Sequence, residues 1–546
     1  MEGPVQIDVP ESRSNIEQEN KPRLSWDVII EKSLSNFGWM DFLQAVLVAI
    51  AMFFDAQQSF GHHLCTIGIP MYPNGTQVVS QSFISIYTDN YPKWHCTNTN
   101  TNSSCSSSSD ICKLPRSSWS WDTHSSNTII SYWNLECAST FVIGLPQSSF
   151  FTGCLLGSSF LAALADSSFG RKKVLIFSCV SMSITSMLII LSTNVWIYSA
   201  LKFLIGFWRS SIGTCVLVLL TEKVSAKWRF RVGIVEYFTF TMGYMSLPGF
   251  AYINRNSSWK SLYLWSSIPA IFYSFIAYFF VTESPRWLVM QGREKEILKM
   301  LNKVSSEESV DDDNINLASS LPKPPAKEKI SIFKHYSSIG KLFHKKWALI
   351  RMIAVMILSI GIGMVYYGMP LAVGNLGFNI YLAVVFSASM EIPSCVAIYF
   401  LENYRRKLSI LVFSILSGIC CVMCVVVENN VPAIKVVLAM IAFFGASTAY
   451  NVFLIYIIEL FPTCVRNTTT SLVRQATVFG CIFCPFLISA GRKNNIFSYG
   501  MFGVVIMLSN LIFFYLPETK GIVLCDTMDQ QEKKELAIYD AMNQQE

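Results

Sequence analysis

Apolar runs of about 20 residues, each long enough to cross a hydrocarbon core of roughly 30 Å as a helix, recur along the whole chain and constrain its fold more than any other feature. Lipid offers the backbone no hydrogen-bond partners, so each run must form a helix that satisfies its own N–H and C=O groups. The sequence therefore predicts an all-α membrane protein with twelve transmembrane helices. The runs cover residues 41–61, 140–165, 172–192, 195–220, 232–253, 261–282, 347–370, 377–401, 408–427, 431–459, 468–491 and 497–516.

The distribution of Lys and Arg predicts the orientation of these helices in the bilayer. With both termini on one side, the loops of that side carry 30 of the 42 basic residues and the loops of the other side carry 7. Cytoplasmic loops collect positive charge, so we expect both termini in the cytoplasm and the first apolar run as its own insertion signal. The net charge of +6 follows from this asymmetry, so no nucleic acid is expected as a partner.

Three charged landmarks appear twice with nearly the same spacing. "ADSSFGRKK" at 165–173 resembles "LENYRRK" at 401–407, and the acids Asp166 and Glu402 are 236 residues apart. The acid and base of "TEKVSAKWR" recur in "IELFPTCVR" 237 residues later, and the glutamate of "TESPRW" recurs in "PETKG" 235 residues later. One common offset predicts two homologous six-helix halves.

The repeat and the charge count together divide the chain into segments. The first half contains an insertion, residues 62–139, which the charge count places outside the cell or in a lumen. The predicted segments are a cytoplasmic N-terminus at 1–40, a first half at 41–282, a cytoplasmic linker at 283–346, a second half at 347–516 and a cytoplasmic C-terminus at 517–546.

The insertion has the composition of an extracytoplasmic loop domain. It is polar and contains glycosylation sequons at Asn74 and Asn102. Four cysteines there have the potential to form two disulfides in an oxidising compartment, although the sequence does not settle their connectivity and a fifth, Cys65, makes the number odd. The four disulfide candidates are Cys96, Cys105, Cys112 and Cys137.

The linker begins with the signals of a helix start. Ser284 and Pro285 suit the N-cap and the first turn, and "RWLVMQGREKEILKMLNKV" then alternates apolar and charged residues at helical spacing. We expect this helix to lie along the membrane face.

Acids and bases gather at the predicted cytoplasmic ends of helices 2, 4, 8 and 10. Ordinary membrane anchoring would explain the bases but does not need the acids. We expect ion pairs that join helix ends across the two halves, close the cytoplasmic face and separate when it opens. The residues of this gate network are Asp166, Arg171, Glu222, Arg229, Glu402, Arg406, Glu459 and Arg466.

These motifs together resemble those of the major facilitator superfamily, and the cysteine-bearing loop after the first helix resembles its organic cation and organic anion branch. "FLQAVLVAIAMFFDAQQSF" at 42–60 is similar to the first helix of plant organic cation/carnitine transporters. The chain departs from the superfamily motif at Ala162, Glu402 and Arg405. The resemblance implies a transporter fold and alternating access for nearly the whole chain.

Ionisable side chains within the predicted helices mark a candidate substrate site, because such groups are costly in a membrane. Aromatic rings offer faces for a quaternary ammonium group. The alternative for each ring is that it packs against neighbouring side chains, and the alternative for Asp55 is that it faces water. Glu236 is a further ionisable residue within the predicted helices, and its alternative is to join the cytoplasmic charges. The candidate substrate-binding residues are Asp55, Trp208, Arg209, Tyr244, Tyr366, Tyr367, Glu391, Tyr450 and Arg474.

The arginines within the membrane bear on the class of substrate. A buried arginine needs a partner, so Arg209 and Arg474 each pair with an acid such as Glu391, or one meets the carboxylate of a zwitterion such as carnitine. Glu391 lies in "SMEIPSC", where Pro393 frees a backbone carbonyl and lets the helix bend toward a cavity.

We therefore expect a secondary transporter of a small organic cation or zwitterion, carnitine-like or polyamine-like, driven by the membrane potential or by protons carried on Glu391 or Asp55. A carrier of organic anions or sugars with the same fold remains an alternative, as does a membrane receptor that binds the ligand without moving it. The lipid bilayer is its environment, in the plasma membrane or a vacuolar membrane.

Other chemistry finds little support in the sequence. "CIFC" at 481–484 and "CCVMC" at 420–424 lie inside predicted helices without a second ligand pair, so no metal site is expected. The chain contains neither a nucleotide-binding P-loop nor a nucleophile elbow. We expect no cofactor, no ATP hydrolysis and no enzyme activity.

Overall fold

The described part of the chain is almost entirely helical. Its one sheet is an antiparallel pair of strands, β1 (Trp94–Cys96) and β2 (Trp119–Trp121). The computed structural model describes residues 38–60, 94–96, 112, 115, 119–121, 129–166, 169–224, 226–253, 258–293, 296, 340, 344–372, 380–401, 404–427, 432–491, 498–519, 528–529 and 531–532.

The long helices form two groups in chain order. The first group contains α2 (Trp39–Phe60), α5 (Thr140–Asp166), α6 (Arg171–Leu188), α7 (Val195–Arg209), α8 (Ile212–Glu222), α9 (Ala226–Ile253) and α10 (Trp259–Phe280). The second group contains α15 (Lys346–Ala372), α16 (Ile380–Leu401), α17 (Arg406–Val426), α18 (Pro432–Leu460), α19 (Thr463–Gly491) and α20 (Tyr499–Asn510). Short 3-10 helices follow α6 and α20, at Ile189–Leu191 and Leu511–Tyr515.

Nine helical stretches in the described residues are long and apolar enough to cross a membrane, and each overlaps one of the expected runs. Val385–Leu401 and Tyr499–Phe513 are shorter apolar helices. Helix α9 has 28 residues but carries charges along its first turns. A multi-pass helical protein is thus confirmed, and the number of twelve spans stays a prediction.

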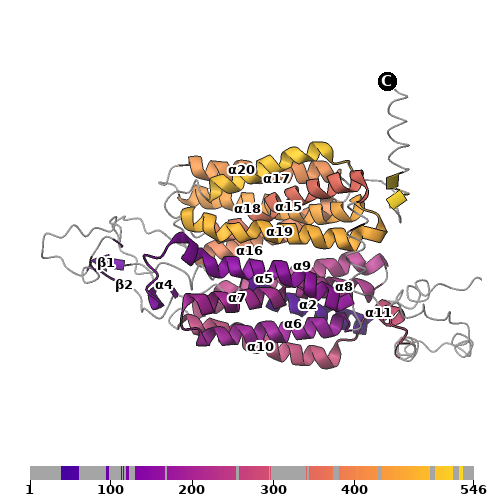
Figure 1. Cartoon of the computed structure of the whole chain (residues 1–546), viewed down its shortest axis with the longest axis horizontal. Coiled ribbons are helices and arrows are strands. Elements are labelled where there is room, and N and C mark those ends of the chain that lie inside the picture. The colour runs from indigo at the N-terminus through magenta and orange to yellow at the C-terminus, as the bar shows by residue number, and fades with distance from the viewer. Residues whose placement is uncertain are drawn as a thin grey trace, which may run out of the picture.

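The two ends of the helix bundle differ in what they carry (Figure 1). The hairpin end carries β1, β2 and the short helix α4 (Ile129–Tyr132), and near it a disulfide joins Cys112 to Cys137. The opposite end, called the motif end, carries α11 (Pro285–Met290) and the starts of α6 and α17. Asn74, Asn102 and Cys105 lie outside the described residues, so the sequons and a second disulfide stay predictions.

The start of the linker forms a helix, as the sequence signals predict, but this helix covers only Pro285–Met290. Ser284 is the N-cap of α11, and its hydroxyl accepts a hydrogen bond from Trp287 N at 3.2 Å. The helix then ends at Met290, and Gly292 has a left-handed φ of 65°. The expectation of one continuous helix is therefore wrong at this turn, where glycine supplies the backbone freedom that stops the helix.

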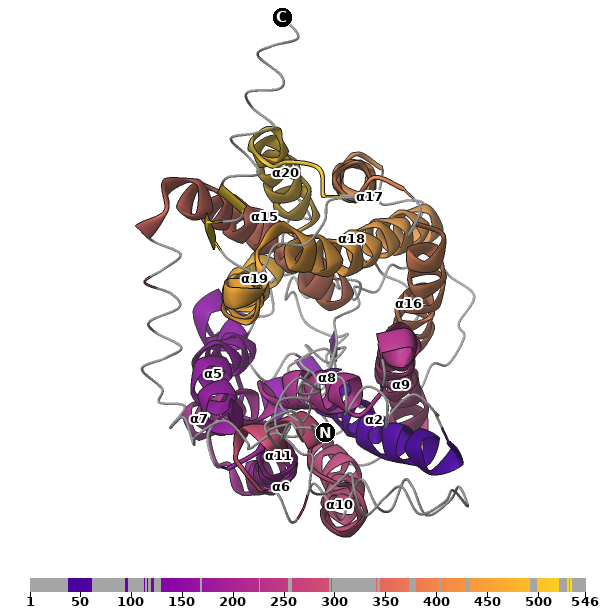
Figure 2. The ribbon, with the colours of Figure 1, turned by 90° about the vertical axis from the view of Figure 1, so that its right-hand side faces the viewer.

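The two helix groups face each other along two lines of contact (Figure 2). Helix α5 lies beside α19, and α9 lies beside α16. Along the first line, Ser148 donates a hydrogen bond to Ile482 O at 2.8 Å, and Gln475 Nε2 donates to Ser159 Oγ at 2.7 Å. These contacts join residues more than 300 positions apart, so the two halves meet as separate bundles.

Glycines bring α5 and α7 close together within the first half. A Cβ on Gly206 would overlap the carbonyl oxygen of Phe150, and a Cβ on Gly153 would overlap the carbonyl oxygen of Phe203. Small residues let membrane helices approach at backbone distance. This contact fixes α7, whose last residue is Arg209, against α5.

Replacing Gly206 by Ala should lower the stability of the protein by about 1–3 kcal/mol, because backbone atoms of α5 would have to move. Gly233→Ala is the matched control, since nothing lies within 4 Å of its added Cβ and alanine favours a helix. Thermal unfolding of the purified protein in detergent measures both. Equal midpoints for the two variants would contradict the close contact.

Candidate functional site

Glu391 of α16 is a buried carboxylate held by hydroxyl groups. Tyr366 donates its hydroxyl to Oε1 at 3.0 Å, and Ser447 donates to Oε2 at 2.8 Å. The residue is 5% exposed. Within the described part of the chain Glu391 forms no ion pair, so two neutral donors from α15 and α18 take the place of a cation.

A chain of small polar side chains extends from this carboxylate. Ser394, one turn further along α16, lies 3.1 Å from Ser447 and accepts hydrogen bonds from Thr448 at 3.2 Å and Asn451 Nδ2 at 3.4 Å. All four are buried. Pro393 lacks the N–H that would continue the backbone hydrogen bonding of α16, so these side chains lie next to an interruption in that helix.

Stacked aromatic rings stand next to Glu391. The ring of Tyr366 stacks on Tyr450 with centroids 4.8 Å apart and on Phe443 with centroids 5.8 Å apart. Tyr367 meets Phe151 of α5 edge to face at 6.0 Å. The tyrosines that the sequence suggested are therefore brought together, and they reach the contact between the halves.

Tyr244 joins the same group from the first half. It lies fully buried in α9 and interacts electrostatically with Glu391. Trp208 does not join it. Its ring instead contacts Phe177 and Phe207, with centroids 5.3 and 5.0 Å away.

Asp55 and Arg209 form a two-pronged ion pair between α2 and α7. Arg209 Nε lies 3.0 Å from Oδ1, and Nη2 donates to Oδ2 at 3.0 Å. Both side chains are buried, the arginine at 14% and the aspartate at 3% exposed. Of the two alternatives for Arg209, pairing with an acid is thus the one observed, and the acid is Asp55 and not Glu391.

Arg474 of α19 has a different environment. It donates one hydrogen bond, at 3.4 Å, to Thr214 of α8 in the other half, and among the described residues it forms no ion pair. Glu236, Tyr237 and Tyr450 interact with it electrostatically.

Four of these residues lie at one depth in the bundle. Glu236, Glu391, Tyr450 and Arg474 are each ten or eleven residues from the motif end of their own helix. That spacing corresponds to about 15 Å of helix. Two acids, an arginine and a tyrosine from both halves thus share one level near the middle of the bundle.

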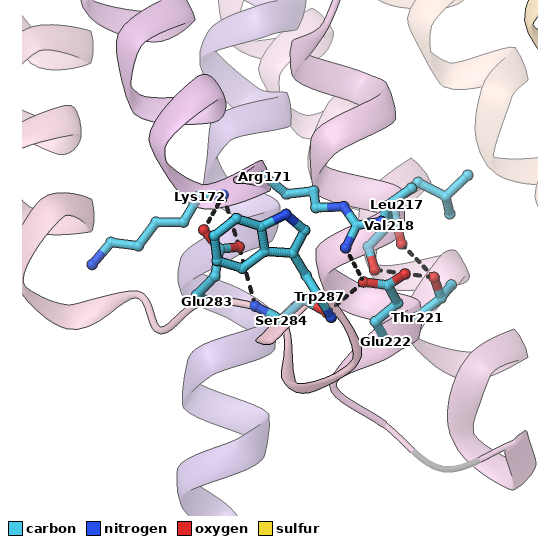
Figure 3. Close-up of polar contacts among 9 residues, drawn as sticks. All are labelled: Arg171, Lys172, Leu217, Val218, Thr221, Glu222, Glu283, Ser284 and Trp287. Carbon is cyan, nitrogen blue, oxygen red and sulfur yellow. Dashed lines mark hydrogen bonds and ion pairs between the residues drawn. The ribbon is translucent and has the colours of Figure 1, made fainter. Parts of the chain in front are cut away.

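A second polar site lies at the motif end of the first half (Figure 3). Arg171, at the start of α6, forms an ion pair with Glu222, at the end of α8, with 3.2 Å between Nη1 and Oε2. Ser284 donates its hydroxyl to the same oxygen while it caps α11. Glu222 therefore joins the ends of three helices.

Glu283 completes this site by capping α6. Its two carboxylate oxygens accept the backbone N–H of Lys172 at 3.1 and 3.2 Å, and Oε1 also accepts Ser284 N at 3.1 Å. A carboxylate at a helix N-terminus is favoured by the helix dipole. Gly170, just before α6, has a φ of 93°, and a Cβ there would collide with Glu283 and Trp287.

The second half repeats this arrangement with its own residues. Arg406 Nε lies 3.5 Å from Glu459 Oε1, and Thr519 donates to Glu459 Oε2 at 2.7 Å. Glu518 accepts the backbone N–H of Arg406 at 2.9 Å and of Lys407 at 3.4 Å. The repeat predicted from the sequence is thus present as a repeated set of contacts.

The expectation that these ion pairs join the two halves is wrong for the pairs that the structure describes. Arg171 reaches Glu222 because α6 and α8 pack in one half, and Arg406 reaches Glu459 because α17 and α18 pack in the other. The pairs hold each bundle together. The side chains of Asp166, Arg229 and Arg466, and the whole of Glu402, lie outside the described residues.

Gln44 connects further helix ends at the motif end. Its Nε2 donates to Phe280 O at 2.7 Å, and its Oε1 accepts Lys223 Nζ and Thr282 N, both at 3.3 Å. Burial lowers the pKa of Lys223 to about 7, and the negative charge of Glu283 partly opposes this shift. The ends of α2, α8 and α10 thus meet through one amide.

The chain is similar to known proteins over nearly its whole length. The family model "Sugar (and other) transporter" matches residues 79–528. "Organic cation/carnitine transporter 3" of Arabidopsis thaliana is 44% identical over 537 residues, which are 98% of this chain and 98% of that protein. "Organic cation/carnitine transporter 2" of the same plant is 45% identical, over 96% of this chain and 97% of that protein. The chain belongs to the organic cation/carnitine transporter family of the major facilitator superfamily.

A solved structure supports the superfamily fold. The partially occluded inward-open form of the xylose transporter XylE from E. coli is similar to the chain with a TM-score of 0.58, over 89% of this chain and 99% of that one. The identity is only 15%, so the likeness concerns the fold. This member of the organic cation/carnitine transporter family is thus a multi-pass membrane transporter and not an enzyme.

The sequence did not single out every residue of the motif-end sites in this transporter. The sequence motifs mark Glu283 and Glu518 as landmarks of the repeat and Ser284 as a helix cap, and they assign no role to Thr519. The signal was nonetheless present, because both glutamate and hydroxyl positions repeat at the offset of 235.

Asp55→Asn should destabilise the transporter by about 3–5 kcal/mol, because Arg209 would stay charged and buried without its counter-ion. The double variant Asp55→Asn, Arg209→Gln should be more stable than Asp55→Asn alone. Thermal unfolding in detergent checks both. Additive losses in the double variant would show that the two residues are not coupled.

Ser284→Ala should cost the transporter about 0.5–2 kcal/mol, because it removes both the cap of α11 and a donor to Glu222. Thr519→Val removes only the matching donor to Glu459, so its loss should be smaller. The same unfolding assay compares the two. A larger loss for Thr519→Val would contradict the double role of Ser284.

Proposed function

We propose that this transporter carries small organic cations or zwitterions, such as carnitine or polyamines, by alternating access around the level of Glu391. The observation that carries the proposal is the set of groups that surround that carboxylate. It is buried, it lies next to stacked tyrosines, and its two partners in the described residues are hydroxyl groups.

A quaternary or protonated ammonium group fits these surroundings. An ionised carboxylate whose donors are neutral hydroxyl groups has no counter-ion, so it attracts a cation strongly in a medium of low dielectric constant. Tyr366 is stacked between Tyr450 and Phe443, so the ring of Tyr450 is the one that offers a π face to a cation, worth about 2 kcal/mol where water is excluded. An ammonium group near Glu391 would thus meet a charge and an aromatic face together.

Arg474 supports a zwitterion as one class of substrate. Asp55 neutralises Arg209, which leaves Arg474 as an arginine at the level of Glu391 that forms no ion pair among the described residues. A guanidinium group binds a carboxylate with two parallel hydrogen bonds. A molecule with an ammonium group and a carboxylate has a partner for each.

Alternating access would move the two bundles against each other while the motif-end sites hold each bundle rigid. The membrane potential or a proton gradient would drive the cycle, with Glu391 or Asp55 as the proton carrier. With both termini in the cytoplasm, the hairpin end would face the outside of the cell at the plasma membrane or the lumen of a vacuole.

Cells that express the wild-type chain should take up labelled carnitine, tetraethylammonium or putrescine with saturation, and Glu391→Gln should reduce that uptake at least tenfold. Glu296→Gln is the matched control, because Glu296 lies on the surface with its side chain 57% exposed. Surface abundance is matched by labelling the exterior of the cells.

Three results would count against this function. Uptake that survives in Glu391→Gln would remove Glu391 from the site. No uptake of any cation or zwitterion at normal surface abundance would favour organic anions or sugars, which are then tested in the same cells. Binding of a cation without uptake would favour a receptor.

A further inference from the structure

Glu236 is a buried acid that the cation site around Glu391 does not use. It lies in α9 of the first half and is 7% exposed. Its Oε2 atom has no hydrogen-bond partner among the described residues, and the side chain forms no ion pair there. A buried carboxylate that lacks partners carries a large desolvation cost, which a nearby positive charge or a bound proton offsets.

Arg474 of the second half supplies that charge. It lies at the same depth as Glu236, interacts with it electrostatically, and already reaches across the contact between the halves to Thr214. The two groups do not come within ion-pair distance of each other. Arg474 also has an Nε atom without a hydrogen-bond partner in the described residues. Glu236 and Arg474 thus attract each other, and each keeps a buried polar atom without a hydrogen-bond partner in the described residues.

We propose that Glu236 is the internal competitor of the substrate carboxylate: in the empty transporter its charge offsets that of Arg474 from across the contact between the halves, and the carboxylate of a bound zwitterion takes over this role. This inference rests on the proposed function, in which the substrate ammonium group binds near Glu391. A cation without a carboxylate would leave Glu236 and Arg474 together. Glu236 is therefore a residue that sets the selectivity between zwitterions and simple cations.

The positions of the two residues give this competition a second consequence. Glu236 belongs to the first half and Arg474 to the second, so their attraction holds the halves together at this level. A substrate carboxylate on Arg474 would weaken that attraction. Binding of a zwitterion and movement of the halves would then be coupled, as differential binding to two states requires.

Uptake kinetics of two substrates test the competition. Glu236→Gln should lower the KM for carnitine about fivefold to tenfold, within the range of coupled sites, and leave the KM for tetraethylammonium unchanged. Arg474→Gln should raise the KM for carnitine at least as much, and should change the KM for tetraethylammonium less than that for carnitine. Glu296→Gln, which alters an exposed acid, should change neither.

A stability cycle tests the attraction itself without any substrate. Glu236→Gln, Arg474→Gln and the double variant are compared by thermal unfolding of the full chain in detergent. The double variant should be more stable than the sum of the two single losses predicts. Additive losses would overturn the pairing, whichever substrate the transporter carries.

The outcomes separate this inference from the proposed function. Wild-type uptake of tetraethylammonium with equal effects of Glu236→Gln on both substrates would overturn the competition and leave the cation transporter standing. Absence of both uptakes in the wild type would overturn the proposed function, and the competition for a substrate carboxylate with it. Selective changes for carnitine, together with a non-additive stability cycle, would support the inference.

Discussion

An ionised side chain inside a bilayer must find its partner within the protein, because lipid solvates neither charges nor backbone dipoles. The arrangement of the helices follows this constraint. Arg209 and Asp55 neutralise each other between α7 and α2. Glu391 is stabilised by hydroxyl groups from α15 and α18. Each charged group thereby joins its own helix to particular neighbouring helices.

The motif-end sites occur twice because the two halves carry the same charged motifs. In each half an arginine at the start of one helix meets a glutamate at the end of another, and a second glutamate caps the arginine-bearing helix. Arg171, Glu222 and Glu283 do this in the first half. These contacts cross helix boundaries but stay within one bundle. Rigid bundles that meet along two lines of helix contact are the structural requirement for a rocking movement.

Much of the fold followed from local patterns in the sequence. The apolar runs predicted the helices, the common offset predicted the two halves, and Ser284 and Pro285 predicted the start of α11. The prediction failed where the outcome depended on neighbours in space. Gly292 adopts a left-handed conformation and ends α11, although the residues around it have helical periodicity. Trp208 lies against Phe177 and Phe207 because the rotation of α7 in its bundle, which no sequence pattern gives, points it there.

The sequence by itself determined most of the helical segments, which halves correspond and how deep each charge lies along its helix, because these properties depend on composition and on the fixed rise of a helix. Only the tertiary structure decided which acid meets which base. Close contacts such as Gly206 against Phe150 place α7 so that Arg209 meets Asp55. The contact between the two halves likewise brings Arg474 near enough to Glu236 for the two charges to interact. Pairing between helices is a property of their relative placement, and spacing along one chain does not contain it.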